Sequence, residues 1–187
     1  MLEIEIMIYL IRHATPDFNR HDLVYYLPPG PPLTSKGVQE AEEVAEFLKG
    51  VGIARVYTSP LERCLQTART IEQAVGLASA TEPGLAEIRR GESEAELLAR
   101  VWPVWEKVVR ECQSEGGAAA LVTHGAPVNV LLKALGVEEA ILSRYHSTFD
   151  YTNPLPPAGI WKAALPLGSE RWELALVFMP SGVSILI

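Results

Sequence analysis

The sequence predicts an α/β fold, a three-layer sandwich with a mostly parallel central sheet, helices on both faces, and a C-terminal hairpin or pair of edge strands. Apolar runs without sustained polar alternation occur at residues 4–11 and 118–123, as in strands buried on both faces. These runs alternate with segments of helical periodicity, the order that builds a covered parallel sheet. Because 187 residues with 48% hydrophobic content suffice for one core, we expect a single domain over residues 1–187.

The first half of the chain reads as strand, helix, strand. The strand at residues 4–11 ends at Arg12 and His13. Residues 34–49 place apolar side chains at helical spacing, and glycines follow directly, so we expect an amphipathic helix there. Residues 53–57 are predicted to form a short strand.

Two helix starts are indicated by capping boxes, in which a serine and a glutamate three residues later satisfy each other's backbone N–H groups. Ser59 and Glu62 have this spacing, and the helix after them is expected to run to about Gly76. Ser93 and Glu96 repeat it at the start of a longer helix, which Pro103 is expected to kink or split.

The last third is less regular. A central strand is predicted at residues 118–123, followed by a helix that Pro127 opens. Residues 144–169 are rich in proline and glycine and show little periodicity. Residues 172–178 and 183–187 flank a Pro-Ser-Gly turn and are predicted to pair as the C-terminal hairpin or edge pair.

Charge and composition limit the classes of partner. A net charge of −7 and a pI near 5.2 oppose attraction to polyanions, so neither nucleic acid nor an anionic membrane is expected as a partner. The two cysteines are too few for a disulfide framework or a four-cysteine zinc site. The N-terminal segment is acidic and its apolar run is short, so we expect a cytoplasmic protein.

Candidate chemistry lies at the carboxyl ends of the predicted strands, where ligands bind in open parallel sheets. Arg12 and His13 end the first strand, Arg63 lies in the helix after the second, and His124 ends the strand at residues 118–123. Arginine forks and helix N-termini suit phosphate oxygens. Neither a nucleotide-binding glycine loop nor a serine-hydrolase elbow occurs, which leaves a histidine as the candidate nucleophile.

The sequence here resembles the histidine phosphatase superfamily, which includes phosphoglycerate mutase-like enzymes. R-H-A at 12–14 is similar to the family's R-H-G signature. Further blocks follow in the family's order: Asn19 six residues after the histidine, P-L-T-S-K-G-V-Q-E-A at 32–41, T-S-P-L-E-R-C-L-Q-T-A at 58–68, L-A-E-I at 85–88 and V-T-H-G at 122–125. The ordered set covers most of residues 4–135.

The resemblance implies roles for these residues. His13 would attack phosphorus and carry a phosphohistidine, while Arg12, Arg63 and His124 would bind the phosphoryl oxygens. Glu87 would donate the proton to the leaving oxygen. These roles agree with the need for a neutral nucleophile, fixed cations and a general acid.

The resemblance also implies that Asn19 is a further phosphate contact. It implies no metal and no cofactor, and the four histidines show no ligand spacing. The expected partner is a small phosphorylated metabolite. His21 and His146 are interpreted as surface residues.

The sequence departs from the family pattern at two places. Ala14 stands where the family has glycine, which raises the question of a narrower phosphate pocket. The G-x-W-E-G stretch that often follows the glutamate is replaced by residues 88–92, Ile-Arg-Arg-Gly-Glu. Arg89 and Arg90 are equally compatible with recognition of an anionic substrate and with plain exposure.

The sequence leaves several functions open. A metal-independent phosphomonoesterase is favoured, because the path from Glu87 to Ser93 is short, whereas mutases of the family usually carry an insertion after the glutamate. A phosphoglycerate mutase-type transferase, a phosphohistidine protein phosphatase and a catalytically silent phosphate-binding protein are the alternatives. Loops at residues 22–32 and 144–169 are candidates to cover the site. Neither the ester nor the oligomeric state follows from the sequence.

Overall fold

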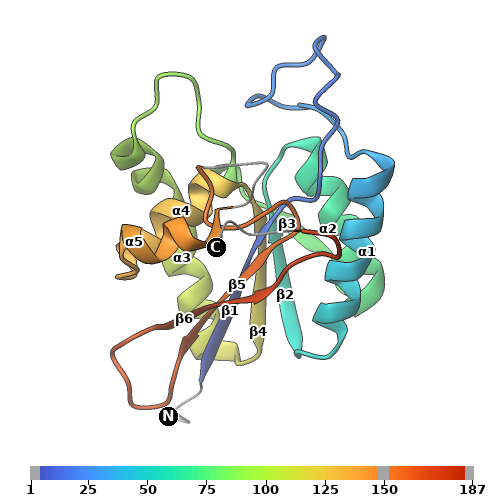
Figure 1. Cartoon of the computed structure of the whole chain (residues 1–187). Helices are drawn as coiled ribbons and strands as arrows, with labels where there is room; N and C mark the ends of the chain where they lie inside the picture. Colours follow the sequence, from blue (N-terminus) through green and yellow to red (C-terminus); the bar gives the residue numbers. More distant parts are fainter. Residues whose placement is uncertain (1–4, 147–151, 184–187) are drawn as a thin grey trace.

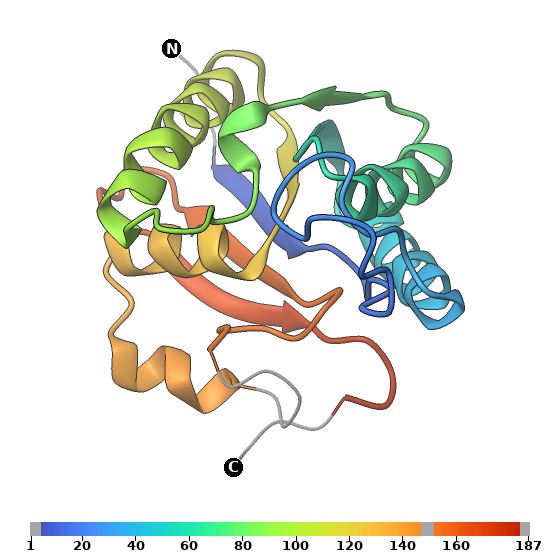
Figure 2. The same ribbon diagram turned by 90° about the horizontal axis from the view of Figure 1, so that it is seen from above.

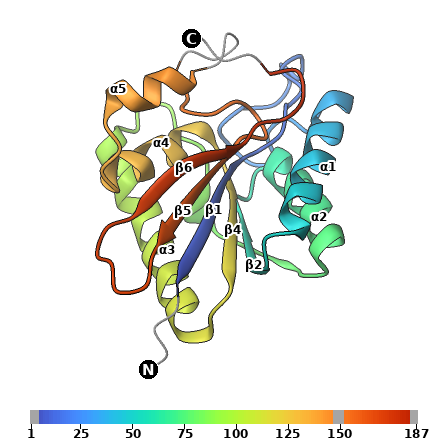
Figure 3. The same ribbon diagram turned by 60° about the horizontal axis from the view of Figure 1, so that its bottom comes forward.

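The computed structural model describes residues 5–146 and 152–183, and they form one six-stranded sheet in the order β3-β2-β4-β1-β5-β6 (Figure 1). The strands are β1 (Ile6–Arg12), β2 (Ile53–Thr58), β3 (Ser79–Thr81), β4 (Ala118–Thr123), β5 (Ile160–Leu165) and β6 (Glu173–Phe178). β1 to β4 are mutually parallel, whereas β5 runs antiparallel to β1 and β6 antiparallel to β5. Figure 3 shows the twisted sheet with β6 at its edge.

Helices cover both faces of the sheet, which makes the three layers visible from above (Figure 2). α1 (Ser35–Lys49) and α2 (Glu62–Val75) pack on one face, and α3 (Glu94–Glu115) and α4 (Gly125–Ala134) on the other. A short α5 (Glu139–Leu142) and two 3₁₀ turns, η1 (Pro83–Leu85) and η2 (Ser143–Tyr145), complete the described elements.

The pleat of β1 explains why its sequence is apolar throughout. Ile8 and Leu10 belong to the core beneath α3 and α4, whereas Tyr9 and Ile11 belong to the core beneath α1 and α2. All four are buried. Alternate residues of a strand point to opposite faces, so a strand in the middle of a covered sheet needs apolar residues at every position. The predicted α/β sandwich is therefore confirmed.

The C-terminal pairing differs from the prediction. Residues 172–178 do form an edge strand, β6, but its partner is β5. β5 lies in the segment that the sequence left without a periodic signal, because Lys162 interrupts its apolar residues and prolines and glycines flank it. Val183 is not in a strand, and residues 184–187 lie outside the described residues, as do residues 1–4 at the start of the first predicted strand.

Of the two capping boxes, one is confirmed and one is wrong. Ser93 and Glu96 cap α3 reciprocally, and α3 continues through Pro103 without splitting. α2 instead begins at Glu62 with Leu61 at its N-cap and no side-chain cap. The Ser59 hydroxyl is used elsewhere, as described below. α4 begins at Gly125, two residues earlier than predicted, and the short edge strand β3 was not predicted.

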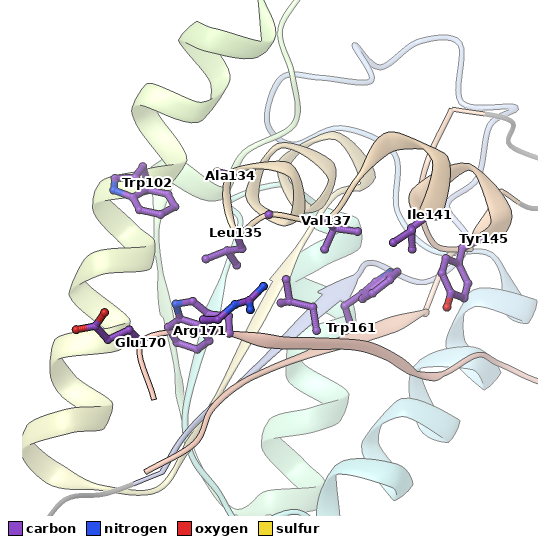
Figure 4. Close-up of a pocket in the computed structure, with 12 residues that line it drawn as sticks. Trp102, Ala134, Leu135, Val137, Ile141, Tyr145, Trp161, Glu170 and Arg171 are labelled. Atoms are coloured by element: carbon purple, nitrogen blue, oxygen red, sulfur yellow. The ribbon is translucent and has the colours of Figure 1, made fainter. Parts of the chain in front are cut away.

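A hollow of about 600 Å³ lies on the α3–α4 side, between the α4–α5 segment and the two C-terminal strands (Figure 4). Its aromatic lining residues are Trp102, Tyr145, Trp161 and Trp172. Within residues 5–146 and 152–183, no helix combines the length and the apolar character needed to cross a bilayer.

Candidate active site

Three parallel strands bring the candidate residues to one end of the sheet. β1 ends in Arg12, which lies opposite Thr123 at the end of β4, and β2 ends beside Val122. His13 and His124 follow directly, and Arg63 stands in the first turn of α2. In Figure 1 the blue segment after β1 and the green segment before α3 rise from this same end. The structure thus brings together candidate residues from three separate parts of the chain.

His13 is oriented by its own neighbourhood. Its backbone N–H donates to the Thr123 carbonyl (2.9 Å), and its Nδ1 lies 2.8 Å from the Ala14 carbonyl. A carbonyl only accepts, so Nδ1 carries the ring proton and Nε2 presents a lone pair. Nε2 is buried and has no hydrogen-bond partner among residues 5–146 and 152–183. Burial, with Arg63 and Arg12 nearby, holds the pKa of His13 well below its usual value, which keeps the ring neutral.

His124 lies beside His13, with ring centroids 5.1 Å apart. Arg63 Nη2 lies 3.1 Å from His124 Nδ1, and Ser59 Oγ lies 2.8 Å from Nε2. Because a guanidinium only donates, Nδ1 accepts and Nε2–H donates to Ser59. Burial and Arg63 lower the pKa of His124 as well. Ser59, interpreted from sequence as a helix cap, is therefore a partner of the second histidine.

Arg63 is fully buried and held by the loop at residues 22–32. Its Nη1 donates to the Tyr25 carbonyl (2.8 Å), and its guanidinium carbon lies 4.1 Å from the centre of the Tyr25 ring. Its Nε is buried and finds no hydrogen-bond partner among the residues that the structure describes. A buried cation with an unused donor is suited to receive an anion. The expectation that this loop approaches the site is confirmed for Tyr25.

Glu87 completes the cluster from the segment after η1. Its Oε2 lies 3.5 Å from His124 Nδ1 and 3.7 Å from Arg63 Nη2. Burial raises the pKa of Glu87, although the Arg63 charge acts in the opposite direction. A carboxyl group whose pKa is raised by burial is suited to carry a proton near neutral pH.

The segment that carries Glu87 is fixed by Arg100 of α3. Arg100 Nη1 donates to the carbonyls of Gly84 and Ala86, and Nη2 to the carbonyl of Glu87, each at 2.8 Å. The same guanidinium forms a two-pronged ion pair with Glu92 at 2.7 and 2.9 Å. This pairing lowers the pKa of Glu92 to about 2. Residues 84–92 are therefore ordered by Arg100 rather than by the family's usual stretch.

Ala14 does not project into the phosphate side of the site. Its side chain is fully buried in the core beneath α1 and α2, and its N–H donates to Thr67 Oγ1 (3.2 Å). The extra methyl group relative to glycine is therefore accommodated by core packing.

An open pocket of about 430 Å³ lies over this cluster. Arg12, which is 4% exposed and donates to the Leu155 carbonyl, and Glu87 form its charged lining. Two loops supply most of the rest, which sequence reasoning did not single out: Phe18, Tyr25, Tyr26, Ile88, Ala126, Thr152 and Asn153. For Asn153, the glycine at position 125 was the one available sequence signal. A Cβ at Gly125 would lie 1.8 Å from Asn153 Oδ1, so the close approach of Asn153 requires a glycine there.

Asn19 is the predicted site residue that the structure does not bring to the cluster. It is exposed, its backbone N–H donates to Asp17, and it is not among the residues that line the pocket. Arg89 and Arg90 are also exposed and lie outside that lining. His21 is exposed, as expected for a surface residue.

The donor atoms of His13, Glu87 and His124 lie within 4.8 Å of one another, a spacing compatible with a metal ion. Two guanidinium groups stand against this set, however, and like charges oppose a bound cation. The same charges favour an anion. The chemistry of the donor set therefore fits a phosphoryl group better than a metal.

Comparison with known proteins decides the family. The family model of the histidine phosphatase superfamily (branch 1) matches residues 8–94 and 88–153. The chain belongs to this superfamily. Its curated relatives include a probable phosphoglycerate mutase GpmB of Proteus mirabilis, 35% identical over 50% of this chain, which spans 43% of that relative. A 2,3-bisphosphoglycerate-dependent phosphoglycerate mutase of Thermoplasma acidophilum is 28% identical over 70% of this chain and 78% of its own length.

Solved structures with low sequence identity have the same fold. A phosphoglycerate mutase from Bacillus anthracis superposes with a TM-score of 0.75 at 17% identity, covering 94% of this chain and 93% of its own. A mycobacterial glucosyl-3-phosphoglycerate phosphatase gives 0.71 at 19% identity, covering 92% and 98%. Proteins similar to this chain thus include both mutases and a phosphatase, and the similarity alone does not choose between the two activities.

Proposed function

We propose that the protein is a metal-independent phosphomonoesterase that hydrolyses a small phosphate ester through a phosphohistidine on His13. The observation that carries this proposal is the His13 Nε2 lone pair, which is buried and has no hydrogen-bond partner in the described part of the chain. It lies in a ring that is kept neutral beside two guanidinium groups. Neutral imidazole is a nucleophile, and the fixed cations stabilise the negative charge on the phosphoryl oxygens.

The first half-reaction transfers the phosphoryl group to the enzyme. His13 Nε2 forms a bond to phosphorus while the bond from phosphorus to the ester oxygen breaks. Arg12 and Arg63 bind the phosphoryl oxygens, and His124 joins them by turning its Nε2–H from Ser59 toward the phosphoryl group. Glu87 gives its proton to the departing oxygen, so that a neutral alcohol leaves.

In the second half-reaction, water attacks the phosphohistidine and loses a proton to Glu87. The bond between phosphorus and nitrogen breaks, inorganic phosphate leaves, and neutral His13 and protonated Glu87 are restored. The approach of a dianionic ester favours this cycle, because negative charge beside Glu87 raises its pKa further and holds it protonated before the first step.

Phosphoglycerate mutase-type transfer is the second candidate, since the Thermoplasma relative is named as a mutase. A mutase would return the phosphoryl group to another hydroxyl of the substrate. Hydrolysis is supported by the short connection from Glu87 to α3, which begins at Glu94. Arg100 ties this connection to the helix, leaving no long insertion over the pocket.

The test is release of phosphate from p-nitrophenyl phosphate and a panel of phosphorylated metabolites, with a chelator present. Wild type is compared with His13→Ala and with His21→Ala as an exposed histidine control. Chelator-resistant turnover that His13→Ala abolishes and His21→Ala retains would support the proposal. Folded wild type that releases no phosphate, but exchanges phosphoryl groups between phosphoglycerates, would replace it with mutase activity.

A further inference from the structure

We infer that the pocket selects phosphate esters whose alcohol part is uncharged and carries an aromatic or similarly flat apolar group. This inference rests on the proposed function and names its substrate class. It places esters that carry a carboxylate or a second phosphate among the poor substrates.

A second anionic group on the substrate would need a cationic side chain that the phosphoryl group does not already use. Within the described pocket lining, Arg12 is the one cationic residue, and Glu87 is the one acidic residue, which the proposed mechanism keeps protonated. Arg12 and the buried Arg63 are both engaged by a single phosphoryl group in the proposed mechanism. A carboxylate on the alcohol part would then lie in the pocket without a cation of its own, which is costly away from bulk water.

The neighbouring hollow does not supply the missing charge. It has a volume of about 350 Å³, shares Phe18 and Tyr25 with the first pocket, and contains Arg20. Arg20 already forms a two-pronged pair with Asp22, both bonds at 2.8 Å. Asp17 also lines this hollow, so its charge is balanced rather than basic.

Aromatic residues form part of the pocket lining. The rings of Phe18 and Tyr25 are stacked, with centroids 5.8 Å apart and an interplanar angle of 14°. Tyr25 is held from behind by Arg63, whereas Phe18 remains 44% exposed. An exposed ring backed by a fixed second ring offers a firm stacking surface to a flat group. Tyr26 and Ile88 extend the apolar wall.

The experiment compares three esters whose leaving alcohols are similarly reactive: 2-phenylethyl phosphate, ethyl phosphate and 2-phosphoglycolate. They differ in the group on the carbon next to the ester oxygen, which is a benzyl group, a methyl group or a carboxylate. We expect kcat/KM to be about tenfold higher for the phenylethyl ester than for the ethyl ester, as for burial of one aromatic group, and lowest for phosphoglycolate.

Two variants locate the effect. Phe18→Ala is expected to lower the phenylethyl-to-ethyl ratio of kcat/KM about fivefold, and Phe18→Leu by less. Val24→Ala is the matched control, because Val24 lies on the same loop, is 49% exposed and does not line the pocket. Val24→Ala should leave the ratio unchanged.

The outcomes separate the inference from the proposed function. Equal rates for the ethyl and phenylethyl esters, or a preference for phosphoglycolate, would overturn the inference while hydrolysis through His13 stands. A ratio that does not respond to Phe18→Ala would overturn the stacking surface. Absence of hydrolysis of all three esters and of p-nitrophenyl phosphate by folded protein would refute the proposed function and the inference with it.

Discussion

Replacement of Arg100 by glutamine should damage proton donation without touching the nucleophile. Arg100 is a positioning residue: it contacts the backbone on both sides of Glu87 but none of the groups assigned to the phosphoryl transfer. Glutamine keeps a polar side chain of intermediate length but cannot reach three carbonyls and Glu92 together. The segment at residues 84–92 should therefore hold Glu87 less firmly against His124.

The magnitude follows from the lost hydrogen bonds. Three carbonyls lose their donor, and each such bond contributes about 0.5–1.5 kcal/mol net. The segment is only partly buried, so water replaces part of this, and we expect a loss of about 2 kcal/mol in holding the segment. If Glu87 acts only when held, kcat for an alkyl phosphate should fall by up to about thirtyfold.

The assay compares leaving groups. An alkyl oxygen needs a proton from Glu87, whereas p-nitrophenolate is stable enough to leave without one, so Arg100→Gln should slow ethyl phosphate hydrolysis much more than p-nitrophenyl phosphate hydrolysis. Lys107→Gln is the matched control, because Lys107 also lies on α3 and pairs with a glutamate, Glu82, outside the Glu87 segment. Equal losses for both esters in Arg100→Gln would refute the positioning role.

Three further predictions concern stability. The fold lowers the pKa values of His13 and His124, so below about pH 6.5 the unfolded chain binds protons that the folded chain does not. For each histidine, the free energy of unfolding should therefore fall by up to about 1.4 kcal/mol for every unit by which the pH is lowered. Urea denaturation at a series of pH values measures this slope. Gly37→Ala places a Cβ 2.2 Å from the Thr15 carbonyl oxygen and should cost about 1–3 kcal/mol in thermal or urea unfolding. Ser59→Ala leaves the buried His124 Nε2–H without its acceptor and should cost about 1–3 kcal/mol, with reduced turnover.

Each of these three stability predictions has an outcome that would contradict it. An identical pH slope in wild type and His13→Gln would show that His13 is not held neutral by the fold. For Gly37, the control is Gly50→Ala, whose nearest neighbour atom lies 4.0 Å away, and equal costs at both positions would contradict the steric reason. Unchanged stability and turnover in Ser59→Ala would mean that the hydroxyl is not the partner of His124.

The residues closest to the proposed chemistry were predictable from sequence because they directly follow or begin regular elements. Arg12, His13 and His124 sit at strand ends, where the sheet itself determines their position. Residues from the loops were not predictable in the same way. Tyr25 reaches Arg63, and Asn153 reaches Gly125, only through tertiary packing that has no periodic signature.

Two errors have one physical cause, namely that local patterns compete with long-range partners. Ser59 has the spacing of a cap, but His124 takes its hydroxyl. The partner of residues 172–178 is set by β1, which accepts β5 along its free side and so leaves β5 to pair with β6. Asn19 matched a family position by spacing alone, and its predicted phosphate contact is not supported by its place on the surface. The single domain and the cytoplasmic location stay predictions.

The tryptophans of this chain are all on one side of its sheet. Trp105 and Trp161 lie in the core beneath α3 and α4, and Trp102 and Trp172 pack against the same core, three of the four around the hollow of Figure 4. The opposite core, beneath α1 and α2, has tyrosine and phenylalanine instead. Tryptophan emission therefore reports directly on only one of the two layers. Loosening of the α1–α2 layer would go unseen in a fluorescence melt, and far-ultraviolet circular dichroism is needed beside it.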